Sequence, residues 1–342
     1  MGSSPKLLSE LRAKTIVDCD TLDASVAESL GPFQDCTSNQ AIAYFELLNT
    51  RHEDLIRQSA DAAKRVSSKH PGIKLEALAV EICMIKLGLL ILPHLKGRMH
   101  IQVNPFDAYS TSRTVSAAQR IVDIFDHLSP NLNAKDRVCI KIPSTWEGLQ
   151  ACRILERDHG ISTLATTLFA LEQAAVAAEA GCQYIAPYVN ELAVHFEEGL
   201  VDPSPNHLVC VQSQLYFRKH GYARTATLPA SLTTIAECMS LSGVKHITIA
   251  PPLLRALNET TSADVLAIDG NFSSLFENEE CLREVEATLP EQPLDLIDDE
   301  ERFRILFTRR DSGKQEIKQV KAINIFADMQ VKLEEIVRPY LQ

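Results

Sequence analysis

The sequence lacks a long hydrophobic run and is poor in positive charge, and each deficit excludes a class of protein. The longest apolar run, Ile82–Leu95, contains a lysine and a proline and is too short to cross a bilayer as a helix. The 34 Lys and Arg residues are outnumbered by 45 Asp and Glu residues, which gives a formal net charge of −11. We therefore expect neither a nucleic acid nor a membrane as the main partner.

Cysteine pairs with metal or redox spacing are also missing. The nine cysteines are odd in number, show no CxxC spacing and lie mostly inside apolar segments. This pattern predicts reduced core thiols in an intracellular protein, with no metal site. The first residues, MGSSPKLL, have no hydrophobic signal core and no Ser or Thr at position 6 for myristoylation. We expect a cytoplasmic protein.

A glycine-rich phosphate turn does not follow the first predicted strand, where the sequence reads CDTLDAS. This disfavours an open, doubly wound sheet. Short apolar segments instead alternate with helices, and eight such units are the number that closes a (β/α)8 TIM barrel. The predicted strands cover residues 15–20, a short segment ending at 35–39, 97–104, 138–142, 162–168, 182–189, 224–231 and 246–251.

The predicted helices fill the intervals and extend the barrel at both ends of the chain. They cover residues 23–30, 41–69, 74–92, 112–128, 171–180, 207–220 and 232–242, with an extra N-terminal helix over 6–13. Residues 260–313 are acidic and predicted to be irregular, and a helix over 314–338 is predicted to pack across the barrel. We expect a single domain over 1–342, with a barrel core over about 15–256 and a C-terminal extension over about 257–342.

One lysine interrupts a strand that otherwise is apolar, VCIKIPSTW at residues 138–146. Because side chains alternate along a strand, Ile140 and Ile142 share one face and Lys141 lies on the other. Ser144 and Glu147 have capping-box spacing and predict that a helix begins there. An ammonium group removed from water loses hydration, which lowers its pKa and favours the neutral, nucleophilic amine. The alternative is that Lys141 simply pairs with a carboxylate.

Polar residues occur where the predicted strands end, which is where the active site of this architecture is built. Each has an ordinary structural explanation, such as capping the next helix, bonding a backbone carbonyl or placing an aromatic ring in the core. Seven of them converging on one mouth favour amine catalysis. They are Asp20, Asn39, Gln102, Lys141, Thr166, Tyr188 and Ser231.

Several ordered segments resemble the motifs of the transaldolase family, and the resemblance runs from about residue 6 to about residue 256. It implies a class I, Schiff-base (β/α)8 barrel that acts on a small carbonyl or sugar substrate without metal or organic cofactor. A homodimer is implied by the resemblance alone. The segments are DCDTLD (18–23), QDCTSN (34–39), GRMHIQV (97–103), IKIPSTWEG (140–148), GISTLATTLF (160–169), AAVAAEAGCQYIAPYV (174–189) and ITIAPPLL (247–254).

The resemblance assigns a role to four residues. Lys141 matches the lysine that forms the Schiff base, and Asp20 matches the carboxylate that takes the proton of the hydroxyl beside the bond being broken. Asn39 matches the asparagine that hydrogen-bonds the donor sugar, and Thr166 matches the threonine that holds the catalytic water. These residue types suit iminium chemistry, since the iminium accepts electrons and the carboxylate accepts a proton.

Two departures from the family pattern concern proton transfer. Gln102 stands where transaldolases carry a glutamate, and an amide can position water but cannot titrate. Tyr188 stands where they carry a phenylalanine. This combination resembles the fructose-6-phosphate aldolase branch of the family. It predicts free aldol addition or cleavage instead of obligatory transfer.

Further departures concern the substrate. The two arginines that the family uses at the phosphate are replaced by Glu191 and Thr233, although Ser231 remains. Leu164 replaces an asparagine and makes the wall of the fifth strand more apolar, whereas Gln40 in place of a proline is expected only to relax a turn. Because a glutamate repels phosphate, we expect a substrate without phosphate that is cationic or apolar at the end facing Glu191.

Two other interpretations remain open at this level. Lys245, His246 or Arg255 could supply the missing cations, in which case the protein is an ordinary pentose-phosphate transaldolase that transfers dihydroxyacetone between sugar phosphates. Alternatively, the chain is a non-catalytic binding protein built on a transaldolase frame.

Overall fold

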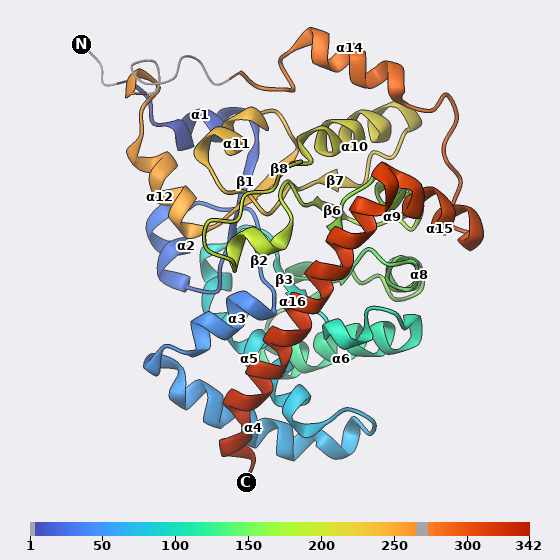
Figure 1. Ribbon diagram of the computed structural model, residues 1–342. Helices are drawn as coiled ribbons and strands as arrows, with labels where there is room; N and C mark the ends of the chain where they lie inside the picture. Colours follow the sequence, from blue (N-terminus) through green and yellow to red (C-terminus); the bar gives the residue numbers. More distant parts are fainter. Residues whose placement is uncertain (1–3, 265–272) are drawn as a thin grey trace.

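Eight parallel strands form a nearly closed barrel in the computed structural model, which describes residues 4–264 and 273–342 (Figure 1). Seven ladders join neighbouring strands in the order β7-β6-β5-β4-β3-β2-β1-β8, and the Thr248 N–H donates to the Pro229 carbonyl at 3.2 Å where β7 and β8 meet. The expected TIM barrel is therefore confirmed. The strands are β1 (Ile16–Asp20), β2 (Cys36–Thr37), β3 (Met99–Gln102), β4 (Val138–Pro143), β5 (Thr163–Leu168), β6 (Tyr184–Pro187), β7 (Ala226–Thr227) and β8 (His246–Ile249).

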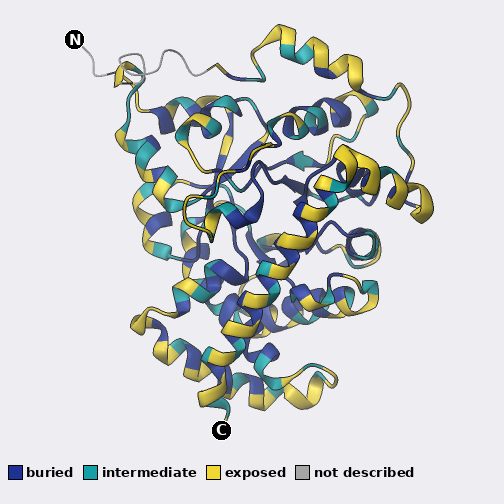
Figure 2. Cartoon of the chain, in the orientation of Figure 1, coloured by how far each residue is buried: buried dark blue, intermediate teal, exposed yellow. Residues whose placement is uncertain are grey.

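Helices surround the barrel and bury their inner faces against it, as Figure 2 shows. None of the described helices is both long and apolar enough to span a membrane. The α-helices are α1 (Leu7–Lys14), α2 (Ala24–Leu30), α3 (Gln40–Leu47), α4 (Glu53–Val66), α5 (Leu75–Ile91), α6 (Thr111–Leu128), α7 (Ala134–Arg137), α8 (Trp146–Ile154), α9 (Leu171–Glu179), α10 (His207–His220), α11 (Ile235–Ser240), α12 (Pro251–Glu259), α14 (Glu279–Thr288), α15 (Glu300–Arg309) and α16 (Lys314–Val337).

Short helical turns complete the connections between these elements. One of them, η5, is a π-helix, and the others are 3-10 helices, whose tighter winding suits brief connections. They are η1 (Thr50–His52), η2 (Ser67–Lys69), η3 (Leu92–His94), η4 (Pro105–Asp107), η5 (Leu155–His159), η6 (Leu192–His195), η7 (Arg310–Gly313) and η8 (Arg338–Leu341).

Alternation along the strands separates two cores. On β4, Ile140 and Ile142 belong to the large core between barrel and helices, whereas Cys139 belongs to a smaller cluster inside the barrel. Lys141, two residues after Cys139, shares its face and points inward. Gln102 and Leu164 flank Lys141 in register, so these three residues form one row across β3, β4 and β5.

A buried polar network closes the amino-terminal end of the barrel. The His246 ring lies 2.8 Å from the Asp18 carboxylate, and the His100 ring lies 3.1 Å from that of Asp35. The Tyr184 ring packs between the two imidazoles, at 5.0 and 5.2 Å between centroids. Burial opposes ionisation of Asp35, but its hydrogen bond to His100 and the attendant charge interaction lower its pKa to about 2. This floor separates the two ends of the barrel interior.

The last helix, α16, crosses the carboxyl-terminal end of the barrel, as expected (Figure 1). It contacts α3, η6 and β5, and its Gln319 side chain donates to the Thr167 carbonyl at 3.3 Å. Phe326 is fully buried and joins the cluster inside the barrel. Residues more than 100 positions beyond β5 and β6 therefore help to form the barrel mouth.

Local capping shifts two of the expected helix boundaries. The predicted helix over 41–69 is split into α3 and α4, since the Asn49 side chain accepts from the Arg51 N–H and starts η1. The helix after β4 begins one residue later than expected. Thr145, and not Ser144, accepts from the Gly148 N–H at 2.9 Å, while the Ser144 hydroxyl donates to the Thr166 carbonyl at 2.7 Å.

The segment over 260–313, expected to be irregular, contains α14 and α15 within its described part; residues 265–272 lie outside it. Asn278 caps α14, and Asp299, from the acidic run at 298–301, caps α15 by accepting from the Arg302 N–H. Carboxylates stabilise the positive end of a helix dipole. The acidic run is exposed, as expected, and it also starts a helix.

Candidate active site

The carboxyl-terminal mouth of the barrel opens into a cavity of about 490 Å³. Five predicted site residues line it, and each comes from the carboxyl-terminal half of a different strand or from the residues that follow it. Parallel strands bring their carboxyl ends to one edge, which explains why residues scattered over more than 200 positions meet. The five are Asp20 on β1, Asn39 after β2, Lys141 on β4, Tyr188 after β6 and Ser231 after β7.

Lys141 contributes a buried amine to this cavity. Its side chain is only 2% exposed, and within residues 4–264 and 273–342 the amine has neither a hydrogen bond nor an ion pair. Desolvation lowers the pKa of Lys141, and the negative charge of Asp20 partly counteracts this by raising it. The alternative that Lys141 is sequestered by a carboxylate therefore does not describe this site.

Asp20 is held by a chain of threonine hydroxyls. The Thr37 hydroxyl donates to the Asp20 carboxylate at 2.6 Å. Because the Thr37 proton is used in this bond, the Thr37 oxygen accepts from the Thr248 hydroxyl, also at 2.6 Å. Thr37 on β2 and Thr248 on β8 flank β1 on either side. They fix the orientation of the carboxylate beside the lysine. The sequence motifs single out neither threonine, although the inward positions of both follow from strand alternation.

Tyr188 and Thr166 form a hydrogen-bonded pair beside the cavity. The Thr166 hydroxyl donates to the Tyr188 oxygen at 3.3 Å, and the Tyr188 and Phe169 rings form an edge-to-face pair at 5.6 Å between centroids. Burial raises the pKa of Tyr188, so its phenol stays protonated at neutral pH. Thr166 does not itself line the cavity; it contacts the residue that does.

Gln102 lies next to Lys141 in register but outside the cavity lining. Its amide nitrogen donates to the Gln40 side chain at 2.8 Å, and Gln40 donates to the Val103 carbonyl at 3.0 Å. Gln40 thus does more than relax a turn: it is 1% exposed and holds Gln102. The Gln102 side-chain oxygen is buried and finds no partner among the described residues, so it can still accept a hydrogen bond.

Asn39 both caps a helix and contributes to the cavity wall. Its side-chain oxygen accepts from the Ile42 N–H at 3.0 Å and starts α3, as the structural explanation proposed. Asn39 also lines the cavity, and its amide nitrogen has no partner within the described chain. Because the cap holds one end of the amide, the other is a fixed donor for a bound ligand.

Ser231 is paired with a residue that the sequence did not indicate, His195. The two side chains lie 2.9 Å apart, and both line the cavity. Leu192 and His195 are three positions apart in η6, and the three-residue turn of a 3-10 helix places both on the cavity side. Desolvation lowers the pKa of His195, whereas the negative charges of Asp20 and Glu237 raise it. Ser231 has a left-handed backbone conformation, with φ of 61°. The backbone N–H and the side-chain amide of Asn190 both donate to the Ser231 carbonyl.

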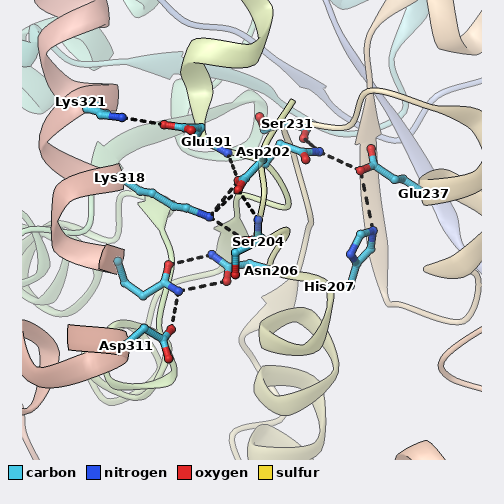
Figure 3. Close-up of polar contacts among 12 residues, drawn as sticks. Glu191, Asp202, Ser204, Asn206, His207, Ser231, Glu237, Asp311, Lys318 and Lys321 are labelled. Atoms are coloured by element: carbon cyan, nitrogen blue, oxygen red, sulfur yellow. Dashed lines mark hydrogen bonds and ion pairs between the residues drawn. The ribbon is translucent and has the colours of Figure 1, made fainter. Parts of the chain in front are cut away.

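The residues at the former arginine positions do not reach the cavity. The Glu191 carboxylate is paired with Lys321 of α16 at 3.0 Å (Figure 3). The backbone N–H of Glu191 donates to the Asp202 carboxylate, which also forms an ion pair with Lys318. Neither Glu191 nor Thr233, which donates to Glu237, lines the cavity. In this structure the Glu191 carboxylate therefore faces Lys321 and not the cavity. Sequence spacing could not reveal a neutralising lysine 130 positions away.

The other expected cations are equally remote. Lys245 and His246 line a different cavity at the amino-terminal end of the barrel, and Arg255 lines neither cavity. Leu164 is buried in the inner cluster beside Lys141 without lining the mouth. The remaining wall of the mouth is largely apolar and includes Leu22, Ile42, Phe45, Leu192, Phe196, Leu232 and Phe326.

Comparison with known proteins gives consistent matches. The family model described as transaldolase/fructose-6-phosphate aldolase matches residues 17–296. The chain is 27% identical to the probable transaldolase of Drosophila melanogaster, an alignment that covers 98% of this chain and 96% of that protein. It is 31% identical to the transaldolase of Acidobacterium capsulatum over 75% of this chain and 77% of that protein, and 30% identical to the transaldolase of Haemophilus ducreyi over 77% and 82%.

Proposed function

The chain belongs to the transaldolase/fructose-6-phosphate aldolase family, and we propose that it acts as a class I aldolase whose Lys141 forms a Schiff base with a ketone that carries no phosphate. The observation that carries the proposal is the unpaired, desolvated Lys141 amine beside Asp20 in the cavity. A neutral amine attacks a carbonyl, whereas an ammonium ion cannot. Because the relatives are named as transaldolases, aldol chemistry is the reaction type that the family supports.

The proposed cycle begins when the Lys141 amine adds to the ketone carbon; the adduct takes up one proton from solvent and loses water, giving an iminium ion. Asp20 then takes the proton from the hydroxyl group on the carbon that will separate from the iminium fragment when the carbon–carbon bond breaks. That carbon becomes an aldehyde, and the electron pair of the broken carbon–carbon bond moves into the iminium to form an enamine. The threonine chain that orients Asp20 supports this assignment, because a general base must be held within hydrogen-bond distance of the proton that it removes.

The enamine must next gain a proton or attack an acceptor aldehyde. Tyr188 is the proposed proton donor, since its phenol is protonated and lines the cavity. Thr166 hydrogen-bonds it, and the unpartnered oxygen of Gln102 offers an acceptor for a hydrolytic water in the row beside Lys141. No carboxylate stands in that row, which favours free aldol cleavage over transfer.

The lining of the cavity supports a substrate without phosphate. Apart from Lys141, which reacts as a neutral amine, His195 is the one basic side chain among the described lining residues, and desolvation lowers its pKa. A phosphate normally receives charge-assisted hydrogen bonds from arginine or lysine, and none is offered here. Phe45, Leu192 and Phe196 instead present apolar surface. Within the small sugars and carbonyl compounds that the family implies, we propose a ketone with an apolar substituent.

A substrate panel tests the proposal. The protein is incubated with dihydroxyacetone, with ketones bearing alkyl or aryl substituents, and with fructose 6-phosphate; each mixture is reduced with borohydride and the Lys141 peptide is measured by mass spectrometry. We expect an irreversible adduct with unphosphorylated ketones. An adduct with fructose 6-phosphate only, together with transfer to erythrose 4-phosphate, would instead assign ordinary transaldolase activity.

Tyr188→Phe provides a separate prediction. The ring and its contact with Phe169 are retained, but the proton donor is lost. We expect turnover to fall by about 10²-fold, because a positioned general acid contributes about 10²–10⁴ in rate. The yield of borohydride-trapped adduct should stay at the wild-type level, since Lys141 is untouched. A fall in adduct yield equal to the fall in turnover would show that Tyr188 serves Schiff-base formation instead.

A further inference from the structure

A second cavity, of about 1080 Å³, lies at the opposite, amino-terminal end of the barrel. It shares no lining residue with the mouth that contains Lys141. Its lining includes residues just before the strands, because parallel strands also gather their amino ends. Lys14 precedes β1, Gln34 precedes β2, Lys96 precedes β3, Arg224 precedes β7 and Lys245 precedes β8.

Positive charge is concentrated in this amino-terminal cavity. Six Lys or Arg side chains line it, and its described lining contains no Asp or Glu, although the whole chain carries a net charge of −11. A concave surface of one sign focuses its field and attracts ions of opposite sign. The six are Arg12, Lys14, Lys96, Arg218, Arg224 and Lys245.

Half of these cations are already neutralised. Lys14 pairs with Glu277 at 2.6 Å, Arg218 with Glu286 at 2.6 Å and Arg224 with Glu156 at 2.5 Å. Lys96 and Lys245 form no ion pair with any residue in 4–264 or 273–342, and both are exposed. Arg12 donates to the Leu30 carbonyl at 2.6 Å and packs on Phe33, so its charge too meets no carboxylate in the described chain.

Two buried polar atoms of the lining also have unfilled hydrogen bonds. The Nε of Arg12 is buried and has no acceptor among the described residues. Thr227, on β7, is 1% exposed, and its hydroxyl likewise finds no partner there. Buried donors are normally satisfied, so these two atoms, one of them charged, can each donate a hydrogen bond to a group that enters the cavity.

We infer that this amino-terminal cavity binds a small, multiply charged anion of the oligophosphate type, held mainly by Lys96, Lys245 and Arg12. These residues come from three separate segments, and a ligand with several anionic oxygens can accept from all of them at once. The site is independent of the Lys141 cavity and of the reaction proposed there, because the floor network of the barrel lies between them.

Calorimetric titration with inorganic tripolyphosphate at low ionic strength tests this site. The wild-type protein should bind one equivalent, and affinity should fall as salt is added. The double variant Lys96→Ala/Lys245→Ala should bind at least about tenfold more weakly, since it loses two charge-assisted contacts. Both side chains are exposed, so the variant should fold, and its thermal transition verifies this.

Matched variants separate the site from general charge effects. Lys69→Ala/Lys314→Ala removes the same charge from exposed positions that line neither cavity and should leave the affinity unchanged. Lys141→Met should also bind tripolyphosphate like the wild type. The inference is overturned if the wild type shows no binding, if both double variants weaken it equally, or if Lys141→Met abolishes it.

Discussion

Lys141→Met should eliminate aldol turnover and borohydride trapping while leaving the barrel folded. Methionine has a similar length and fills the same inward position on β4, but it cannot form an iminium ion. We expect a loss of turnover of at least about 10⁴-fold, in line with the removal of catalytic nucleophiles in other enzymes. Stability should be unchanged or higher, because the buried amine has no partner in the described chain and is desolvated at a cost.

Turnover with the best ketone of the panel, the mass of the reduced protein and the urea midpoint provide the three measurements. Lys135→Met, an exposed lysine on α7, is the matched control and should match the wild type in all three. Adduct formation that persists in Lys141→Met would place the Schiff base on another lysine and refute the proposed mechanism. A large loss of stability would show that Lys141 has an unexpected structural role.

Asp20→Asn should separate Schiff-base formation from bond cleavage. The amide can still accept from the Thr37 hydroxyl, so the geometry is retained, but it cannot take up the substrate proton. We expect cleavage to slow by about 10²–10⁴-fold, the usual contribution of a general base. The iminium should still form and should accumulate, which would increase the yield of trapped adduct with a cleavable ketone.

The pH dependence of trapping gives an independent check on the same variant. Burial lowers the pKa of Lys141, and the Asp20 charge raises it, so removing that charge lowers the pKa further. The neutral amine then persists to lower pH, and the rate of adduct formation against pH should move toward acid in Asp20→Asn. Asp61→Asn, an exposed change on α4, should leave the profile in place. A shift toward alkaline pH would contradict the proposed electrostatics.

The barrel was predictable because its signals are local. Short apolar segments between helices predicted eight strands, and alternation along the fourth predicted that Lys141 lies on the face opposite Ile140 and Ile142. Helix boundaries were less certain, since Asn49 and Thr145 decide them through single side-chain hydrogen bonds. Asp20, Asn39 and Tyr188 could be anticipated as site residues because strand ends in a parallel barrel always meet at one edge.

The sequence by itself determined the barrel, the inward lysine and the polar residues at the strand ends, all of which depend on short-range periodicity and on a topology that such periodicity implies. Only the tertiary structure decided which charged side chains line each cavity. Lys321 pairs with Glu191 outside the lining of the mouth, and His195 contacts Ser231 within it. Lys96 and Lys245 both line the cavity at the opposite end of the barrel. Charge interactions depend on distance in space, and residues 130 positions apart can neutralise each other without leaving any pattern along the chain.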